Sequence, residues 1–250
     1  MKTVSIDDVI IGEGTPKIII PIVGKTEAEI LAIAKEAGQS VCDLLEWRID
    51  HFESVQEKST VASLSKKVKD ICGKPLLITF RSFKEGGVLD ISDAEYFQIY
   101  NDLIENGTFD LLDIELFMPE VEVSQLIDKC HSKGIYVVLC NHEFHLTPSK
   151  DTIMERLKSM EAKGADICKI AVMPNSGDDV LTLLNATYER KQEAKVPLIT
   201  MSMGNLGMIS RLSGEVFGSS ATFGALGEVS APGQMPVNDL SLIINKLKLS

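Results

Sequence analysis

One complete strand–helix–strand unit occupies residues 135–173, IYVVLCNHEFHLTPSKDTIMERLKSMEAKGADICKIAVM. Its two ends, 135–144 and 165–173, are apolar runs with the length of buried strands. Between them apolar residues recur at helical spacing, with Ser149 positioned as an N-cap and Gly164 as a stop signal. The order of these elements indicates two strands of one sheet joined by a helix that covers them.

The same alternation continues along the rest of the chain. Apolar strands are predicted at residues 17–24, 41–50, 75–82, 111–117, 135–144, 165–173, 196–204 and 220–227. Helices are predicted at residues 26–39, 54–71, 92–106, 120–133, 149–164, 177–194, 207–217 and 237–249. Eight strand-then-helix units with short connections predict a (β/α)8 TIM barrel, an α/β fold, as a single domain over residues 1–250. Two strand-like pieces at 2–6 and 8–12 are expected to form a short N-terminal hairpin that caps the bottom of the barrel.

Composition and charge narrow the possible partners and the compartment. The 250 residues are 44% hydrophobic, which provides an ample core, and no apolar run has the length of a membrane span. The formal net charge of -11 argues against nucleic acid or an anionic membrane as the main partner, because both need a basic surface. The start of the chain does not resemble a signal peptide. An odd number of cysteines without a C-x-x-C pair predicts a reduced cytoplasmic protein with neither disulfide framework nor zinc site: Cys42, Cys72, Cys130, Cys140 and Cys168.

Polar residues gather at the C-terminal ends of the predicted strands, where barrel enzymes carry their chemistry. They are Glu46, Arg48, Asp50, Arg81, Glu85, Asp113, Glu115, Asn141, His142, Glu143 and Lys169, followed by Arg211, Ser230 and Gln234 after the last two strands. Glu46 and Arg48 alternate, so their side chains project to the same side. Asp113 and Glu143 are expected to face the helices or solvent. Several arginines around one pocket imply an anionic ligand, most simply a carboxylate.

Lys169 stands at the centre of the apolar run ADICKIAV, residues 165–172. Burial disfavours an ammonium group, so we expect the pKa of Lys169 to be lowered and its amine to attack carbonyl carbons. The structural alternative is a lysine that faces solvent or pairs with a carboxylate. His142 lies at a matching depth on the preceding strand, and an amine beside a histidine suits imine chemistry with proton transfer. The sequence lacks H-x-H and H-E-x-x-H motifs, so this chemistry does not require a metal.

The other polar residues have structural interpretations as well. Glu46 with Arg48, and Arg81 with Glu115, would also serve as ion pairs inside the barrel mouth. Other residues are interpreted as structural: His51, His131 and His145 as histidines without a catalytic part, Met201 and Met203 as core, and Gly86 and Gly87 as turn residues. Glycines 204, 207 and 224 suggest a phosphate cradle only weakly, because the G-x-x-x-x-G-K-[ST] pattern is missing.

The motifs taken together resemble one enzyme family over essentially the whole chain. LLEWRIDHF, TFRSFKEGG, DIELF, NHEFHLTP, ICKIAVMP, ITMSMG, ISRLSGEVFGSSATFGA and SAPGQ are similar to segments of the type I 3-dehydroquinate dehydratases of the shikimate pathway. The resemblance implies a cytoplasmic barrel, usually a homodimer, that dehydrates 3-dehydroquinate to 3-dehydroshikimate on the route to chorismate and the aromatic amino acids. It also implies that neither a metal nor an organic cofactor takes part.

The resemblance assigns roles residue by residue. Lys169 of ICKIAV matches the lysine that forms a Schiff base, His142 of NHEFH the general acid and base, and Glu85 of KEGG the carboxylate that orients that histidine. The substrate-binding positions are matched by Glu46, Arg48, Arg81, Arg211, Ser230 and Gln234, with Arg211 pairing with the substrate carboxylate and the SAPGQ loop closing over the ligand. Pro21 departs from the family, which has a serine there, so one peripheral contact is in doubt.

Two other functions remain open at this level. A class I aldolase would also use a strand-borne lysine in a barrel, although it would usually act on phosphorylated substrates. A non-catalytic barrel that binds a carboxylate metabolite would keep the arginines without needing both Lys169 and His142. Adding dehydroquinate and measuring the absorbance of a conjugated enone distinguishes the dehydratase, the aldolase and the binding protein.

Overall fold

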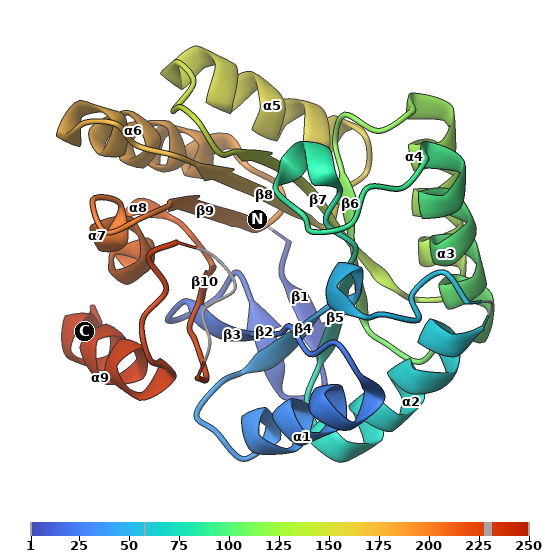
Figure 1. Cartoon of the computed structure of the whole chain (residues 1–250). Coiled ribbons are helices and arrows are strands. Elements are labelled where there is room, and N and C mark those ends of the chain that lie inside the picture. The colour runs from blue at the N-terminus through green and yellow to red at the C-terminus, as the bar shows by residue number, and fades with distance from the viewer. Residues whose placement is uncertain (1, 58, 228–231, 250) are drawn as a thin grey trace.

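The computed structural model describes residues 2–57, 59–227 and 232–249, and in this part of the chain eight parallel strands form a barrel (Figure 1). The strands are β3 (Lys17–Ile22), β4 (Leu44–Arg48), β5 (Leu76–Thr79), β6 (Leu111–Glu115), β7 (Tyr136–Glu143), β8 (Ile167–Val172), β9 (Leu198–Ser202) and β10 (Ala221–Phe223). Each strand pairs with the next in chain order, and β10 pairs with β3. A parallel bridge between Leu198 and Ser219 joins β9 to the segment before β10, which completes the ring. The predicted TIM barrel is confirmed.

Helices form an outer ring around the strands, as Figure 1 shows. They are α1 (Glu27–Gly38), α2 (Thr60–Cys72), α3 (Asp93–Asn106), α4 (Glu120–Ser132), α5 (Lys150–Ala162), α6 (Gly177–Glu193), α7 (Met208–Leu212), α8 (Gly214–Phe217) and α9 (Val237–Leu247), with 3₁₀ turns η1 (Ile49–His51) and η2 (Phe83–Glu85). None of these described helices has both the length and the apolar character that crossing a bilayer requires.

Local sequence signals explain where the helices begin. Thr26, Ser92 and Ser176 each accept a hydrogen bond from the backbone three residues later, and each is part of a capping box. Ser149 caps α5 in the predicted way by accepting from Thr152 N. The helix predicted at 54–71 begins only at Thr60, and the one predicted at 207–217 is divided into α7 and α8.

The N-terminal hairpin closes one end of the barrel. Strands β1 (Val4–Ile6) and β2 (Val9–Ile11) pair antiparallel, and their buried side chains pack with the first inward residues of the barrel strands, including Ile19 and Leu111. The Tyr136 hydroxyl donates a hydrogen bond to the carbonyl of Ser5. The predicted cap at the barrel bottom is therefore confirmed, and the opposite end is left for the polar residues.

On β6 the inward positions change from apolar to charged towards the C-terminal end of the strand. On β6, Leu112 and Ile114 pack in the core between strands and helices, so Leu111, Asp113 and Glu115 point into the barrel. Asp113 is completely buried there. The prediction that Asp113 faces helices or solvent is therefore wrong, because it shares the inward side with Leu111 two residues earlier.

Tyr100 of α3 joins two strands behind this charged layer. Its hydroxyl accepts a hydrogen bond from Phe80 N at 2.8 Å and donates one to the carbonyl of Asp113 at 2.7 Å. All three groups are buried, so neither backbone partner can turn to bulk water when the hydroxyl is removed.

We expect Tyr100→Phe to lower the free energy of unfolding by about 1–3 kcal/mol, the usual cost of a buried polar group left without a partner. Urea unfolding followed by fluorescence measures the difference. Tyr188→Phe is the matched control, since Tyr188 is 51% exposed. Equal midpoints for Tyr100→Phe and the wild-type protein would contradict the prediction.

Candidate active site

A pocket opens at the C-terminal end of the barrel, and we call it the mouth pocket. Its lining residues are Glu46, Arg48, Arg81, Gly86, His142, Phe144, Lys169, Ala171, Met201, Met203, Arg211, Phe223 and Gln234. The lining combines charged side chains with aromatic and methionine side chains. The mouth pocket brings together seven of the nine residues predicted for the site. The other two are Glu85, which lies behind His142, and Ser230, which lies outside the described residues.

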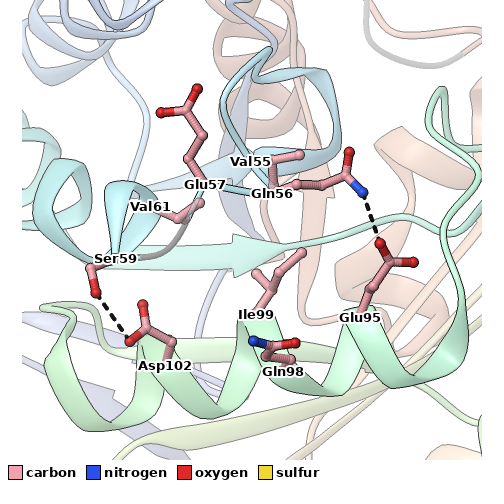
Figure 2. Close-up of a pocket in the computed structure, with 9 residues that line it drawn as sticks. All are labelled: Val55, Gln56, Glu57, Ser59, Val61, Glu95, Gln98, Ile99 and Asp102. Atoms are coloured by element: carbon pink, nitrogen blue, oxygen red, sulfur yellow. Dashed lines mark hydrogen bonds between the residues drawn. The ribbon is translucent and has the colours of Figure 1, made fainter.

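A second hollow lies between the η1–α2 connection and helix α3 (Figure 2). Two pairs of its polar groups are bonded to one another: Gln56 Nε2 donates to Glu95 at 3.0 Å, and Ser59 donates to Asp102 at 3.4 Å. None of its described lining residues is a lysine, histidine or cysteine. The titratable groups of its described lining are therefore carboxylates alone, without the combination of lysine, histidine and arginine that lines the mouth pocket.

Lys169 is 3% exposed and points into the barrel among acceptors. Its Nζ donates to Asp113 Oδ2 at 3.1 Å and to Glu46 Oε1 at 3.3 Å, and it lies 4.9 Å from the centre of the Phe223 ring. Burial by itself lowers the pKa of Lys169, but the Asp113 and Glu46 carboxylates outweigh burial and raise it. The predicted lowering of this pKa is therefore wrong, and the free protein holds Lys169 as an ammonium group.

Asp113 is the centre of a buried ionic network. Its Oδ1 accepts hydrogen bonds from Arg81 Nη2 at 2.8 Å and from Cys140 Sγ at 2.9 Å, while Oδ2 faces Lys169. Burial alone would raise the pKa of Asp113, but Arg81 and Lys169 lower it to about 2. Arg81 also donates to Glu115 at 2.9 Å. The guanidinium of Arg81 is thus paired with carboxylates of the protein, and the ion pair with Glu115 is the one that the sequence allowed as a structural interpretation.

His142 is held by Glu85 from the turn after β5. Glu85 Oε2 lies 2.9 Å from His142 Nδ1 and accepts from the backbone N–H of His142, while Oε1 accepts from Asn141 Nδ2 at 3.1 Å. Burial raises the pKa of Glu85 to about 8, and burial with Arg81 and Lys169 lowers the pKa of His142. At neutral pH the pair consequently has no net charge. It becomes a base when the shared proton leaves, because Nδ1–H then faces a carboxylate and Nε2 has a free lone pair.

The two key side chains stand at different depths. In the β7–β8 register Lys169 is opposite Cys140, and His142 is opposite Ala171. The prediction of a matching depth is therefore wrong. Every second residue of each strand points into the barrel, and His142 lies two residues beyond Cys140, the residue opposite Lys169. His142 therefore lies nearer the mouth than Lys169.

Two arginines differ in how much of their charge is already paired. Arg48 donates twice to Asp50, at 2.8 Å each. Arg211 donates to the carbonyl of Pro232 at 3.0 Å, and it makes no ion pair with any described carboxylate. Burial lowers the pKa of Arg211 to about 10, so it remains positive at neutral pH. Arg211 is the cation best placed to receive an anionic ligand.

The remaining predicted positions lie around the mouth. Gln234 lines the mouth pocket directly. Pro21 lines a neighbouring hollow with Val23, Lys25 and Leu226 and is not among the lining residues of the mouth pocket. In the β3–β4 register Pro21 is opposite Glu46, so the departure at Pro21 lies beside a residue of the pocket wall.

Glu85, Cys140 and His142 place three potential metal ligands within 4.8 Å of one another. Arg81 already supplies a positive charge at this place, since its Nη1 donates to Cys140 Sγ at 3.1 Å and lies 3.7 Å from Glu85 Oε2. We interpret the cluster as a proton-transfer pair with its supporting cation.

Sequence reasoning missed three members of this site. Asp113 was assigned to the outside, and neither Phe144 nor Phe223 was considered, although both line the mouth pocket. Counting alternate residues from a known inward position would have found Asp113 from Leu111. Phe144 lies against Gly86, where an added Cβ would come within 2.4 Å of its ring, a contact between residues far apart in the sequence.

Comparison with known proteins gives a consistent picture. The family model of the type I 3-dehydroquinase matches residues 18–249. The 3-dehydroquinate dehydratase of Enterococcus faecalis is 51% identical over 96% of both chains, and that of Salmonella typhimurium is 45% identical over 99% of both. The solved structure of the Enterococcus faecalis enzyme superposes with a TM-score of 0.94 and covers 98% of this chain and 100% of that chain, at 47% identity. The type I enzyme of Clostridium difficile, solved with a covalent modified comenic acid, gives 0.95 at 43% identity over 98% of both chains.

We expect the ring signals of His142, followed by NMR without substrate, to change near pH 8. The pKa of Glu85 is raised to about 8, so the Glu85–His142 pair loses the proton of Glu85 and becomes negatively charged only as pH rises through that value. In Glu85→Gln this transition should disappear. The remaining transition should lie below the ordinary histidine pKa, because burial and Arg81 disfavour the imidazolium.

Glu57→Gln, in the hollow of Figure 2, is the control and should leave the His142 transition in place. A transition near pH 8 that persists in Glu85→Gln would show that another group causes it.

Proposed function

Because the chain belongs to the type I 3-dehydroquinase family, we propose that it dehydrates 3-dehydroquinate to 3-dehydroshikimate through a Schiff base on Lys169. The enzyme class, a type I 3-dehydroquinate dehydratase and hence a lyase, follows from its relatives. The observation that carries the mechanism is a buried lysine in a pocket that also contains a histidine–carboxylate pair and an arginine without an ion-pair partner among the described residues.

Covalent bonding begins at Lys169. Once the ammonium loses a proton, the amine attacks the ketone carbon, and loss of water gives a protonated imine. Since Asp113 and Glu46 favour the ammonium form, this step becomes faster as pH rises. The same carboxylates then face the positively charged imine and stabilise it. The covalent modified acid in the Clostridium difficile relative supports a covalent scheme.

His142 carries the protons in this proposal. The protonated imine is an electron sink, so the adjacent C–H is acidified, and the base form of the Glu85–His142 pair removes that proton. The resulting enamine expels the hydroxyl on the next carbon as His142 returns a proton to the departing oxygen. Water then hydrolyses the product imine, which releases the conjugated ketone and restores Lys169. One water is lost overall.

The remaining wall residues fit binding and orientation. Arg211 offers its guanidinium to the substrate carboxylate, because it has no ion-pair partner among the described residues. Glu46, Arg48 and Gln234 line the mouth pocket and have polar groups suited to the ring hydroxyls. Arg81 supports the network from below through Asp113 and Glu115. The chemistry needs only side chains of the protein, so we propose no cofactor.

We also propose that the protein acts in the cytoplasm, in the shikimate pathway, as a homodimer. These proposals rest on the family to which the chain belongs. Sedimentation velocity at micromolar concentration tests the assembly, and a monomer throughout the range would reject it.

We expect sodium borohydride with 3-dehydroquinate to fix a mass adduct on the peptide that contains Lys169, because hydride reduces the imine to a stable amine. Lys169→Ala should form no adduct and no enone absorbance. His142→Ala should still form the adduct, with turnover lower by about 10²–10⁴-fold, the usual contribution of a general acid–base group.

Lys158→Ala is the matched control, since Lys158 lies on the exposed face of α5 and pairs with Glu193. It should keep both adduct and turnover. An unmodified Lys169 peptide after reduction with substrate would rule out the covalent scheme. An adduct that formed without enone would instead favour an aldolase or a binding protein.

A further inference from the structure

We propose that Arg156, on the outer helix α5, is a positioning residue that fixes the side-chain amide of Asn141 and through it the Glu85–His142 pair. Arg156 is not among the lining residues of the mouth pocket, so it acts without touching substrate. The proposal rests on the proposed function only where activity is the readout.

The contacts form a continuous chain from helix to pocket. Arg156 Nη1 donates to Asn141 Oδ1 at 2.6 Å, Asn141 Nδ2 donates to Glu85 Oε1 at 3.1 Å, and Glu85 Oε2 lies 2.9 Å from His142 Nδ1. Asn141 is 3% exposed, so water cannot replace either of its partners. The first link joins β7 to the helix that follows it, and the other two join β7 to the turn after β5, more than 50 residues earlier.

Arg156 determines which end of the amide faces Glu85. A guanidinium has only donors, so the oxygen of Asn141 must turn towards it and the NH₂ group must turn towards Glu85. Without Arg156, the amide can rotate and present its oxygen to Glu85. Two oxygens in contact are tolerated only when one of them carries a proton. Loss of Arg156 therefore favours protonated Glu85.

Several groups set the pKa of Glu85, and the hydrogen bond from Asn141 is one of those that lower it. Arg81 at 3.7 Å favours its carboxylate, as does the hydrogen bond from Asn141, while burial and the nearby Glu115 and Asp113 oppose ionisation. The groups that oppose ionisation prevail, since the pKa of Glu85 is raised to about 8. Loss of the hydrogen bond from Asn141 would therefore lower the fraction of Glu85 that is ionised near neutral pH. His142, whose ring faces the same carboxylate, would lose its orienting partner along with it.

The guanidinium of Arg156 is itself well fixed. Nη1 also donates to Glu143 Oε1 at 2.6 Å, and the guanidinium carbon lies 5.2 Å from the centre of the Phe117 ring. Glu143 sits two residues beyond Asn141 on β7, so strand and ring together hold the donor in place. This arrangement separates two possible effects, the amide orientation through Asn141 and the ion pair through Glu143.

The test compares pH profiles of kcat/KM for 3-dehydroquinate. For Arg156→Ala we expect a loss of about tenfold at pH 7 that narrows to less than about threefold at pH 9.5, because a higher pH restores the base form. KM should change little, and Arg156→Lys should recover part of the rate at pH 7. Lys158→Ala removes a positive charge from the same helix and should leave the profile unchanged.

Two further variants locate the effect. Asn141→Ala should reproduce the profile of Arg156→Ala, and the double variant should be no worse than Asn141→Ala alone, because both changes remove the same link. Glu143→Ala keeps the Arg156–Asn141 bond and should not show the loss at pH 7. An equal loss in Glu143→Ala, or a loss in Arg156→Ala that is the same at every pH, would overturn the proposal.

NMR titration of His142 without substrate provides a readout that does not depend on activity. The transition of the Glu85–His142 pair should move to higher pH in Arg156→Ala and stay in place in Lys158→Ala. If the wild-type protein made no enone, the proposed function would fail while this titration still tested the role of Arg156. If enone formed but the transition did not move, only the positioning role would fail.

Discussion

The carboxylate of Asp113, shared between Arg81 and Lys169, is the contact on which the rest of the site depends. Asp113 is fully buried and both cations are nearly so, and a charge left unpaired at such depth costs about 3–5 kcal/mol. Each member therefore fixes the others. Glu46 and Glu115 complete the network, so that three carboxylates surround two cations within the barrel. The mouth of the barrel is consequently held by electrostatic pairing, while the opposite end is filled by the hairpin and apolar layers.

The same pairing sets the resting state of the chemistry. A lysine surrounded by hydrocarbon would be neutral and reactive, whereas Lys169 has two carboxylates that keep its proton in place. In the proposed mechanism those carboxylates would oppose the later steps less, because an iminium ion on Lys169 would carry the same positive charge at nearly the same position as the ammonium. The network would therefore stabilise the covalent intermediate of the proposed mechanism about as well as the free protein, and the step that it would slow is the first deprotonation.

The sequence predicts the barrel well because each strand and helix is marked locally, by apolar runs, N-caps such as Ser149 and stop signals such as Gly164. It also predicts which end carries the chemistry, because His142 stands near the end of one strand and Arg211 follows another. Protonation states were beyond reach, since the lowered pKa predicted for Lys169 ignored Asp113, 56 residues away along the chain. The relative depth of His142 depends on strand register, which the sequence does not mark.

That offset in depth has a chemical meaning. Two residues along a strand correspond to about 6.6 Å, so the backbone of His142 lies about that far towards the mouth from the residue opposite Lys169. In the proposed mechanism the imine forms at the ketone carbon, but the proton to be removed belongs to the neighbouring carbon, and the hydroxyl that departs belongs to the next one. A base at the same level as the amine would meet the carbon already bonded to it. A base one inward position nearer the mouth can reach the atoms beyond that carbon, which are the ones that exchange protons during dehydration.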